Sequence, residues 1–438
     1  MWIGFDDTDS EFGGCTTYIA YELIYKLLSN GFSIIGYPRL IRLNPMVPWK
    51  TRGNGAVAIE IGSGSGEQEC FGINGEKKYL MNKTSKANKI NKKAIIQIIE
   101  SVIEEYAQFN IENTNPAYLI LDNPLTKEIY DKAVNTIVKK EKIISEIEKV
   151  NGIYKLYNNG RGIIGASAAI SWDSLNENTF ELISYRLKDN WGKKRYINID
   201  SVKKMDSSFP LTFNNFDYDN NHNCIVPNSP CPILYGIRSE TDLILPDCQK
   251  MILSEKNKGW MIFISNQGTD DHLRKKSISN IKPFQSVIVK GSVSKNPIRL
   301  DGGHVIFSLT DKDKNSIDCA AYEPTKGFRN IVDQLRINDI IEVYGGVREN
   351  PITINIEKIN IIKLVEIIEK IENPLCPDCK KHMKSKGKNK GYYCKKCKTY
   401  SNQPITKKKE RLIKKGFYEV PVCARRHLSK PLKRMNLN

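Results

Sequence analysis

The sequence predicts a multidomain protein that combines α/β and α+β domains. Its 438 residues are too many for a single hydrophobic core and correspond to about three domains. Strands alternate with helices in the N-terminal part, a strand-rich segment occupies 286–362, and two close pairs of cysteines follow at 376–397. These three observations predict an α/β domain first, then a β-barrel, then a small domain held by a metal ion.

The first eighteen residues carry the strongest indication of chemistry. The apolar run 2–5 predicts a buried strand, and a helical pattern begins near Thr16 and ends at Gly31. The stretch between them carries three aspartates and two glycines: Asp6, Asp7, Asp9, Gly13 and Gly14. Carboxylates beside a helix N-terminus would repel a phosphate unless Mg²⁺ lay between them, which favours a metal–nucleotide site. A polar turn that caps the helix is the alternative.

The next part of the chain continues the α/β pattern. Strands are predicted at 32–43 and 56–61, a helix at 88–107 and a strand at 118–121. Residues 62–75 contain Gly-Ser-Gly-Ser-Gly without the lysine of a P-loop, so we expect a flexible linker there.

A glycine-rich stretch at 158–169 reads Asn-Asn-Gly-Arg-Gly-Ile-Ile-Gly-Ala-Ser-Ala-Ala. Glycines such as Gly162 would let the backbone approach an anion closely, and Arg161 could bind that anion. A helix of small residues packed against a sheet explains the same composition, so both interpretations stay open.

The following segment contains fewer decisive signals. Strands are predicted at 179–187, 195–199 and 259–265, with a short helix after the second one. The polar loop 266–272 suits ligand contact or an ordinary interdomain connector.

The segment from 286 to 362 predicts an OB-fold, because three strands, a helix and two strands follow one another. The strands are expected at 286–294, 304–310, 316–322, 339–347 and 352–362, and the helix at 327–335. Such barrels bind single-stranded nucleic acid on aromatic and cationic side chains. The candidates for this contact are Phe307, Tyr322, Phe328, Arg329 and Tyr344, although some of these aromatic residues must form the core.

Four cysteines form two C-x-x-C pairs that are separated by fourteen residues: Cys376, Cys379, Cys394 and Cys397. Each pair would present two thiolates to one tetrahedral Zn²⁺, with a small hairpin between the pairs, so a zinc ribbon is predicted. Because four protein ligands leave no position for water, this zinc is structural. The total of eleven cysteines argues for thiols and metal ligands instead of disulfides.

The charge is concentrated at the C-terminal end. Residues 374–438 carry 20 lysines and arginines against 3 acidic residues, so nearly all of the formal charge of +18 lies there. A neutral body with a cationic end predicts a polyanionic partner, and nucleic acid is the first candidate. The basic tail, which includes Arg425 and Arg426, is expected to order on RNA. No apolar run is long enough for a membrane span and no signal-peptide pattern is present, so a cytoplasmic protein without membrane contact is expected.

Seven motifs along the whole chain resemble the archaeal tRNA(Ile) 2-agmatinylcytidine synthetase (agmatidine synthetase) family. They are 6–10 (Asp-Asp-Thr-Asp-Ser), 14–18 (Gly-Cys-Thr-Thr-Tyr), 159–166 (Asn-Gly-Arg-Gly-Ile-Ile-Gly-Ala), 266–269 (Asn-Gln-Gly-Thr), 302–305 (Gly-Gly-His-Val), 321–325 (Ala-Tyr-Glu-Pro-Thr) and 424–428 (Ala-Arg-Arg-His-Leu). The resemblance implies an ATP-dependent ligase that attaches agmatine to C2 of the wobble cytidine in the isoleucine tRNA with anticodon CAU, which then decodes AUA. It further implies AMP as a product and a cytidine phosphorylated at its C2 oxygen as the intermediate.

The resemblance also implies the identity of each domain. The expected domains are a kinase-like catalytic domain at 1–153, a ferredoxin-like domain at 154–275, an OB-fold at 282–366, a zinc ribbon at 374–400 and a basic RNA-binding tail at 401–438. The boundary between the first two domains stays open, and the first can be discontinuous.

In that family the threonine after the cysteine is autophosphorylated, and this residue is Thr16 here. A hydroxyl at a helix N-terminus beside metal-bound carboxylates is well placed to receive a phosphoryl group. Which aspartate binds Mg²⁺ and which acts as a base stays open. The residues expected to bind phosphate are Gly13, Gly14, Thr17, Arg161 and Gly162. Those expected to bind the dication agmatine are Asp217, Asp219, Gln267 and Thr269.

Two other classes of protein fit parts of the sequence. An aspartyl-phosphate phosphohydrolase would place Asp7 and Asp9 after a strand as nucleophile and acid, and it predicts a phosphoaspartate intermediate. A non-catalytic single-strand nucleic-acid-binding protein would use only the barrel and the ribbon, and it predicts no ATP consumption.

Overall fold

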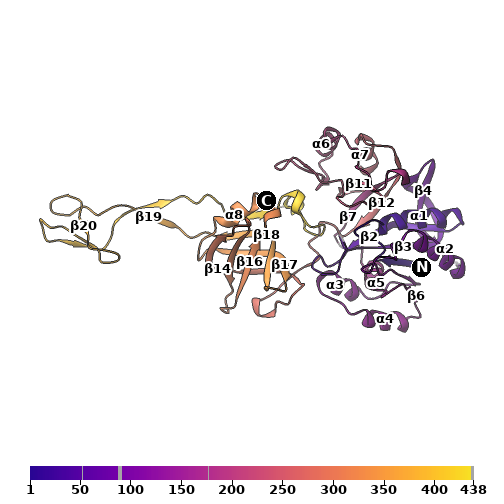
Figure 1. Cartoon of the computed structure of the whole chain (residues 1–438), viewed down its shortest axis with the longest axis horizontal. Coiled ribbons are helices and arrows are strands. Elements are labelled where there is room, and N and C mark those ends of the chain that lie inside the picture. The colour runs from indigo at the N-terminus through magenta and orange to yellow at the C-terminus, as the bar shows by residue number, and fades with distance from the viewer. Residues whose placement is uncertain (52, 87–90, 176, 436–438) are drawn as a thin grey trace.

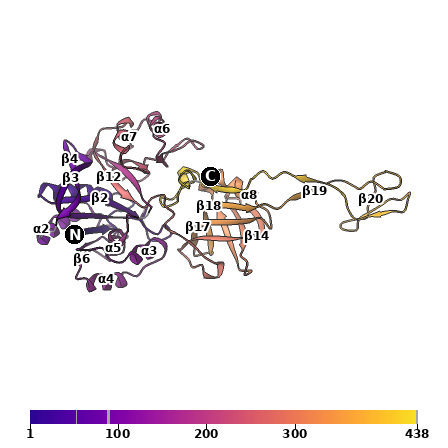
Figure 2. The same ribbon diagram turned by 180° about the vertical axis from the view of Figure 1, so that it is seen from behind.

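The computed structural model describes residues 1–51, 53–86, 91–175 and 177–435. Figure 1 shows a mixed α and β body, a β-barrel beside it, and a thin arm that projects from the barrel away from the body. The view from behind shows the same order of parts (Figure 2). In the described part of the chain, no helix is long and apolar enough to span a membrane.

One ten-stranded sheet runs through the whole body, in the order β6-β5-β1-β3-β4-β2-β12-β7-β11-β8. The strands are β1 (Trp2–Asp6), β2 (Ser33–Arg42), β3 (Gly55–Asn74), β4 (Lys77–Lys86), β5 (Ala117–Leu121), β6 (Ile153–Leu156), β7 (Thr179–Arg186), β8 (Thr212–Phe213), β11 (Ile233–Ser239) and β12 (Asn257–Ser265). Most neighbours are antiparallel, but β2 is parallel to β4 and to β12. The pairing of β2 with β12 joins the N-terminal and C-terminal halves of the body into one sheet.

Seven helices cover the described part of this sheet. They are α1 (Thr16–Ser29), α2 (Lys92–Tyr106), α3 (Lys127–Asn135), α4 (Lys140–Lys149), α5 (Ile163–Ser171), α6 (Ile199–Ser208) and α7 (Leu245–Met251). Ile3 and Phe5 of β1 face the core beneath α1 and α2, whereas Trp2 faces the core beneath α3, α4 and α5. This alternation along β1 is the period of two expected for a strand buried on both faces.

Helix α5 contains the small residues because it lies directly on β1. A Cβ atom added to Gly4 would lie 2.5 Å from the carbonyl oxygen of Ala166. The interpretation of the stretch 158–169 as a small-residue helix packed against a sheet is therefore confirmed for the part from Ile163 onward. Helix α5 comes after residue 153, where the second domain was expected to begin, yet it packs on β1 of the first domain.

Two expectations for the body are wrong. Residues 62–74 form the second half of β3 and pair with β4, so this segment is not a flexible linker. Its glycines make room for side chains of β4, since a Cβ at Gly62 would lie 2.2 Å from Ser85 Oγ. Residues 195–199 form no strand, and only one bridge joins Ile197 to Ser254. Of the helix expected at 88–107, residues 88–90 lie outside the described residues.

The barrel has the order predicted for an OB-fold. Its elements are β14 (Ser286–Arg299), β15 (Val305–Thr310), β16 (Ser316–Ala321), α8 (Phe328–Asp333), β17 (Ile340–Arg348) and β18 (Thr353–Lys363), and the pairing of β14 with β17 closes it. Phe307 and Phe328 are 2% and 4% exposed and belong to its core. The expectation that these two rings stack on RNA is therefore wrong.

The arm leaves the barrel through β19 (Ile367–Glu372), which pairs with the returning β23 (Ile405–Lys409). At its tip, the sulfur atoms of the four predicted cysteines lie within 4.8 Å of one another, and Cys379 Sγ lies 3.7 Å from Cys394 Sγ. Two ligands of a tetrahedral zinc with bonds of about 2.3 Å lie about 3.8 Å apart, so the residues fit the predicted zinc. The expected hairpin between the pairs is present as β20 (Lys384–Ser385) and β21 (Tyr392–Tyr393).

The end of the chain returns to the barrel and then to the body. Strand β24 (Gly416–Glu419) pairs with β18, and residues 420–435, which we call the C-terminal segment, continue onto the body. Arg434 is buried there and forms ion pairs with Glu240 and Glu177. From residue 416 onward the tail is ordered against the protein itself, so this part does not need RNA to become ordered, in contrast to the expectation for the tail.

Candidate active site

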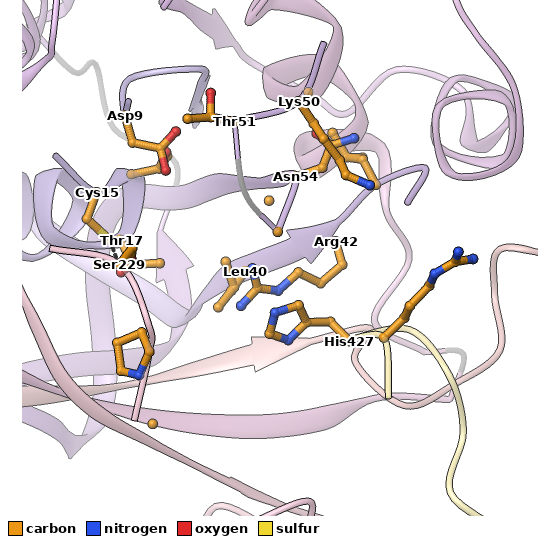
Figure 3. Close-up of a pocket in the computed structure, with 18 of the residues that line it drawn as sticks. Asp9, Cys15, Thr17, Leu40, Arg42, Lys50, Thr51, Asn54, Ser229 and His427 are labelled. Atoms are coloured by element: carbon orange, nitrogen blue, oxygen red, sulfur yellow. Dashed lines mark hydrogen bonds between the residues drawn. The ribbon is translucent and has the colours of Figure 1, made fainter. Parts of the chain in front are cut away.

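A cavity of about 510 Å³ opens where the N-terminal loop, the second half of the sheet and the C-terminal segment meet. The last residue of β1, Asp6, lines it together with Asp7 and Asp9 of the following loop, and α1 contributes Thr16 and Thr17. Figure 3 shows Asp9 and Thr17 on one side of this cavity and Arg42, Lys50 and His427 on the other. The cavity therefore has an acidic side with hydroxyl groups and a cationic side.

Arg161 ties the acidic side to the start of α5. Its guanidinium donates to Asp7 Oδ2 at 3.0 Å and to the carbonyl oxygens of Asn113 and Trp49 at 3.1 and 3.4 Å. Gly165 lies against Asp6, since a Cβ atom there would lie 1.9 Å from Asp6 Oδ2. The glycine-rich stretch thus lets α5 approach the protein's own carboxylate, and Arg161 and Gly162 also line the cavity.

Burial makes two aspartates of this side, Asp6 and Asp7, weaker acids than usual. It raises the pKa of Asp6 well above the usual range, and the nearby charge of Asp7 raises it further. Burial also raises the pKa of Asp7 to about 6, although Arg161 opposes this change. Because a cation would reverse this electrostatic cost, the acidic side is suited to a divalent metal ion or to a proton that is shared with a ligand.

Thr16 occupies the first position of α1. The hydroxyl of Thr8 donates to Thr16 Oγ1 at 3.0 Å, which leaves the proton of the Thr16 hydroxyl for another acceptor. Cys15 precedes the helix, and its sulfur lies 3.1 Å from Thr17 Oγ1. The N–H of Tyr18 donates to the carbonyl oxygen of Cys15 at 3.0 Å, so the N–H groups of Thr16 and Thr17 are those that this helix start offers to an anion.

Gly13 and Gly14, which were expected to bind phosphate, do not line the cavity. The N–H of Ser10 donates to the carbonyl oxygen of Gly13, and the N–H of Gly13 donates back to Ser10. Gly14 has φ +75 and a Cβ there would lie 2.8 Å from Gln108 Cγ. Both glycines shape the turn that precedes α1.

The cationic side is organised around the buried carboxylate of Glu181 on β7. Its oxygens lie 3.2 Å from Arg238 Nε and 3.6 Å from Arg42 Nη2. The Gln267 side chain donates to the same carboxylate through Nε2. The Nε atom of Arg42 is buried and has no hydrogen-bond partner among the described residues.

The C-terminal segment supplies three further cationic or basic side chains to this side. Arg425 pairs with Glu419, Arg426 pairs with Glu357, and the ring of His427 faces the cavity. Burial and the neighbouring Arg426 lower the pKa of Lys50 to about 8. Arg425 and Arg426 were expected to bind RNA, and the structure places both in the wall of this cavity.

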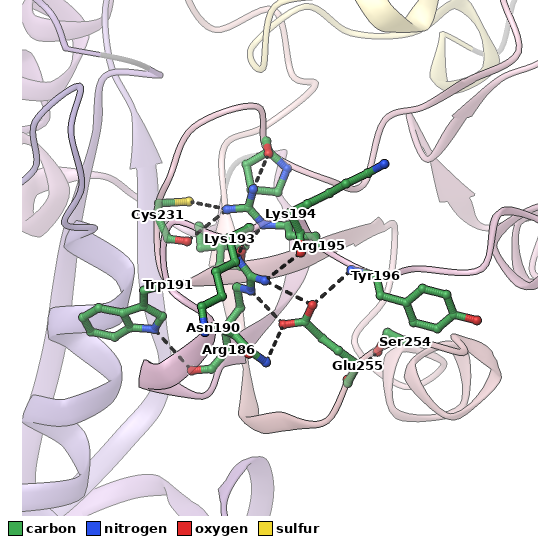
Figure 4. Close-up of polar contacts among 12 residues, drawn as sticks. Arg186, Asn190, Trp191, Lys193, Lys194, Arg195, Tyr196, Cys231, Ser254 and Glu255 are labelled. Carbon is green, nitrogen blue, oxygen red and sulfur yellow. Dashed lines mark hydrogen bonds and ion pairs between the residues drawn. The ribbon is translucent and has the colours of Figure 1, made fainter.

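One wall of the cavity is the loop 225–233, and Arg195 holds it in place (Figure 4). The guanidinium of Arg195 donates to the carbonyl oxygens of Pro227, Ser229 and Ile233 at 2.8 to 2.9 Å and to that of Cys231 at 3.0 Å. The adjacent Arg186 and Glu255 form an ion pair of 2.8 Å. A planar fork of donors therefore sets the shape of this wall.

The residues expected to bind agmatine do not line the cavity. Asp219 is exposed, and Asp217 accepts hydrogen bonds from the backbone N–H groups of Cys423 and Asn220, each at 3.0 Å. Thr269 donates to the carbonyl oxygen of Asn266 at 2.7 Å within a turn. Gln267 lies directly behind the wall, in contact with Glu181 and His427.

On the barrel, Tyr322 and Arg329 are partly buried. Tyr322 packs against the guanidinium of Arg348, which lies 5.1 Å from the ring centroid. Arg329 donates to the carbonyl oxygen of Gly303 at 2.6 Å and forms an ion pair with Glu323. Both side chains keep part of their surface for a ligand. Tyr344 is buried, with 8% of its surface exposed.

Sequence reasoning missed Glu181, Arg42 and Arg238 as parts of the site. One signal was available, because Glu181 lies between apolar residues of a predicted strand and a buried charge requires partners. Its arginine partners come from strands that are distant in the sequence, so nothing local identified them.

Family models match almost the whole chain. The models described as "TiaS TCKD domain" and "TiaS FLD domain" match residues 2–158 and 160–272. The model described as "OB-fold nucleic acid binding domain" matches 287–362, and that described as "TiaS C-terminal zinc ribbon domain" matches 373–413.

Relatives are similar over their full length. A protein of Methanocaldococcus jannaschii, named as the 2-agmatinylcytidine synthetase TiaS of an isoleucine tRNA, is 47% identical over 447 residues, which cover 100% of this chain and 99% of that protein. The crystal structure of a TiaS complex with this isoleucine tRNA and ATP is 37% identical with a TM-score of 0.85, covering 100% of this chain and 98% of the other. The structure of a TiaS complex with the tRNA, AMPCPP and agmatine is 35% identical with a TM-score of 0.83 and the same coverage.

Proposed function

The chain belongs to the tRNA(Ile) 2-agmatinylcytidine synthetase family, TiaS, and on that premise we propose that it joins agmatine to the wobble cytidine of the isoleucine tRNA with anticodon CAU, using ATP. The observation that supports this most is the cavity itself, where the N-terminal aspartates and Thr16 meet the Arg-Arg-His motif of the C-terminal segment. Its acidic and cationic sides suit a reaction between a metal–nucleotide, a cationic amine and an RNA base. Since ATP and tRNA are cytoplasmic molecules, we place the enzyme there.

The topology supports the finer domain assignment that we propose for the body. Among the strands of the large sheet, the order from β7 to β12 is strand, helix, two strands, helix, strand, with the spatial order β12-β7-β11-β8. This is the arrangement of a ferredoxin-like domain. Two short strands between β8 and β11, at Phe216–Asp217 and His222–Asn223, pair only with each other. The remaining part, from β1 to α5, forms the kinase-like domain, to which α5 belongs through its packing on β1.

The acidic side is the proposed phosphoryl-transfer site. Asp6, Asp7 and Asp9 provide the hard oxygen ligands that Mg²⁺ prefers. Their carboxylate oxygens do not lie as close together as the sulfur atoms of the four cysteines, which form the one such cluster among the described residues. One or two carboxylates would therefore share the ion with phosphate oxygens, and the bound ion would neutralise the charge of the transferred group. The Thr16 hydroxyl is then the acceptor of that group during autophosphorylation.

The cationic side and the arm are proposed to hold the tRNA. The wall residues Arg42, Arg425 and Arg426 are placed to contact the phosphates that flank the wobble base. The nine lysines between 380 and 398 extend the contact to the tip of the arm. The wall loop held by Arg195, with Glu181 behind it, replaces Asp217 and Asp219 as the best candidate for the agmatine pocket.

The test of the proposed function is the fate of ATP. The full-length protein is incubated with Mg²⁺, the CAU-anticodon tRNA and agmatine, and the nucleotide products are separated. We expect AMP to form only when the tRNA is present. AMP formation without tRNA would point to the phosphohydrolase instead, and no ATP consumption at all would point to the non-catalytic binding protein.

A further inference from the structure

His427 is the side chain of the cavity that reaches it from furthest along the chain. The C-terminal segment crosses from the barrel to the body and is anchored at this point, because the N–H of Gly268 donates to the carbonyl oxygen of His427 at 2.8 Å. Figure 3 shows the imidazole beside Arg42, on the cationic side of the cavity. Its ring is therefore held at a fixed place in the wall.

The hydrogen bonds around His427 determine which ring nitrogen carries the proton. The carboxylate of Glu181, which is 3% exposed, can only accept hydrogen bonds, and Gln267 donates to it through Nε2. This contact orients the amide of Gln267, so that its Oε1 faces His427 Nδ1 at 3.0 Å. Arg238 Nε also donates to this oxygen, at 3.2 Å. Since Oε1 can only accept, Nδ1 of His427 carries the proton and Nε2 carries the lone pair.

The lone pair of Nε2 faces the side of the ring that borders the cavity. A Cβ atom added to Gly53, which also lines the cavity, would lie 3.2 Å from Nε2. Within the described part of the chain, no hydrogen-bond partner of Nε2 is found. A ligand that enters the cavity therefore meets a nitrogen that can accept a proton.

The charges that face this ring keep it neutral. The cationic Arg42 on β2, together with burial and Arg238 on β11, holds the pKa of His427 well below its usual range. Glu181 on β7 offsets part of this positive charge. The same arginines disfavour the ammonium form of a substrate amine at this place and favour the neutral, nucleophilic form.

We propose that Nε2 of His427 is the proton acceptor for the amine nucleophile in the agmatine-transfer step, which rests on the proposed function. The amine nitrogen forms a bond to C2 of the phosphorylated cytosine, and the bond between C2 and the phosphate-bearing oxygen breaks. Its electron pair leaves with the phosphate. The nitrogen becomes strongly acidic once it is bonded to C2, so its proton moves to Nε2 although Arg42 and Arg238 disfavour the charged ring, and it passes from there to solvent. Gln267 is a positioning residue, because it holds the tautomer that leaves Nε2 unprotonated.

The test separates the two half-reactions in the full-length His427→Ala variant. With ATP, Mg²⁺ and the CAU-anticodon tRNA, we expect ATP turnover and the phosphorylated cytidine to form nearly as in the wild type. Agmatine incorporation into the tRNA is expected to fall at least about 100-fold, the usual contribution of a positioned base. Added imidazole should restore part of the incorporation, whereas pyrazole, a ring of the same size and much weaker basicity, should restore none.

A second variant distinguishes a positioning role from a structural one. Gln267→Leu keeps the imidazole but removes its tautomeric partner, so incorporation should fall while imidazole gives no rescue. Full incorporation by His427→Ala would overturn the proposal. The proposal would also be overturned if His427→Ala and the milder His427→Gln lost ATP turnover and agmatine incorporation to the same extent at unchanged thermal stability. The ring would then bind the base or the nucleotide and would not act on the amine. If the wild type consumes no ATP in the presence of tRNA, this result contradicts the proposed function of the protein. The role of His427 is contradicted only by the results of the variants.

Discussion

Glu357 joins the barrel to the body and to the C-terminal segment, which forms one wall of the cavity, and its removal gives a quantitative prediction. It lies on β18 of the barrel, where Oε1 is 2.5 Å from Arg426 Nη1 of the C-terminal segment and Oε2 is 3.1 Å from His272 Nε2 of the body. Burial alone would raise the pKa of this carboxyl, but Arg426 and His272 lower it from 4.5 to about 2. That change corresponds to about 3 kcal/mol of folding free energy.

The sign of the pH dependence follows from the direction of this shift. A carboxyl whose pKa is lower in the folded protein stabilises the fold above its unfolded value of 4.5. The stabilisation is lost as the pH falls from there toward about 2. We expect Glu357→Gln to lower the free energy of unfolding at pH 7 by about 3 kcal/mol, and to make its decrease between pH 5 and pH 3 less steep than in the wild type.

The assay is urea unfolding of the full-length protein at several pH values, followed by tryptophan fluorescence. The matched control is Glu366→Gln, which breaks an exposed ion pair with Lys408 and should leave the unfolding curve unchanged. Equal stability of Glu357→Gln and the wild type at pH 7 would refute the view that this carboxylate clamps the three parts together.

Three further predictions concern the proposed chemistry. Thr16→Ala should abolish acid-stable labelling of the protein by γ-labelled ATP and Thr16→Ser should retain it, whereas label on Thr16→Ala would place the acceptor elsewhere. Deletion of 374–404, with a short linker between β19 and β23, should weaken tRNA binding and reduce its salt dependence in filter-binding assays, without changing the affinity for ATP. Unchanged tRNA affinity would contradict the role of the arm. Arg195→Lys keeps the charge but loses the planar guanidinium that holds the wall loop. The KM for agmatine should therefore rise about tenfold or more, with little change in the KM for ATP. Equal effects on both KM values would show a general structural defect.

Features that depend on neighbours in the sequence were predictable. The spacing of the four cysteines identified the zinc ribbon, and the order of strands and one helix from 286 to 362 identified the OB-fold. The aspartates and Thr16 were recognised as one site because a strand, a loop and a helix start follow one another within sixteen residues. Their burial and the ion pair of Asp7 with Arg161 required the fold.

Features that depend on distant contacts were not predictable from local patterns. Residues 62–74 have the composition of a linker, yet their pairing with β4 makes them a strand. Phe307 on β15 and Phe328 on α8 are buried in one core cluster, and only the packing of these two elements against each other separates them from surface aromatics. The C-terminal segment looked like a basic tail because its acidic partners, Glu177 and Glu240, lie far away in the sequence.

The central claim is that one cavity conjugates agmatine to a tRNA base, and mass spectrometry of the tRNA tests it most directly. The protein is incubated with ATP, Mg²⁺, agmatine and the CAU-anticodon isoleucine tRNA, and the tRNA is then digested to nucleosides. We predict that one cytidine, at the wobble position, gains the mass of agmatine less that of water. An unmodified wobble cytidine under conditions where ATP is consumed would contradict the account.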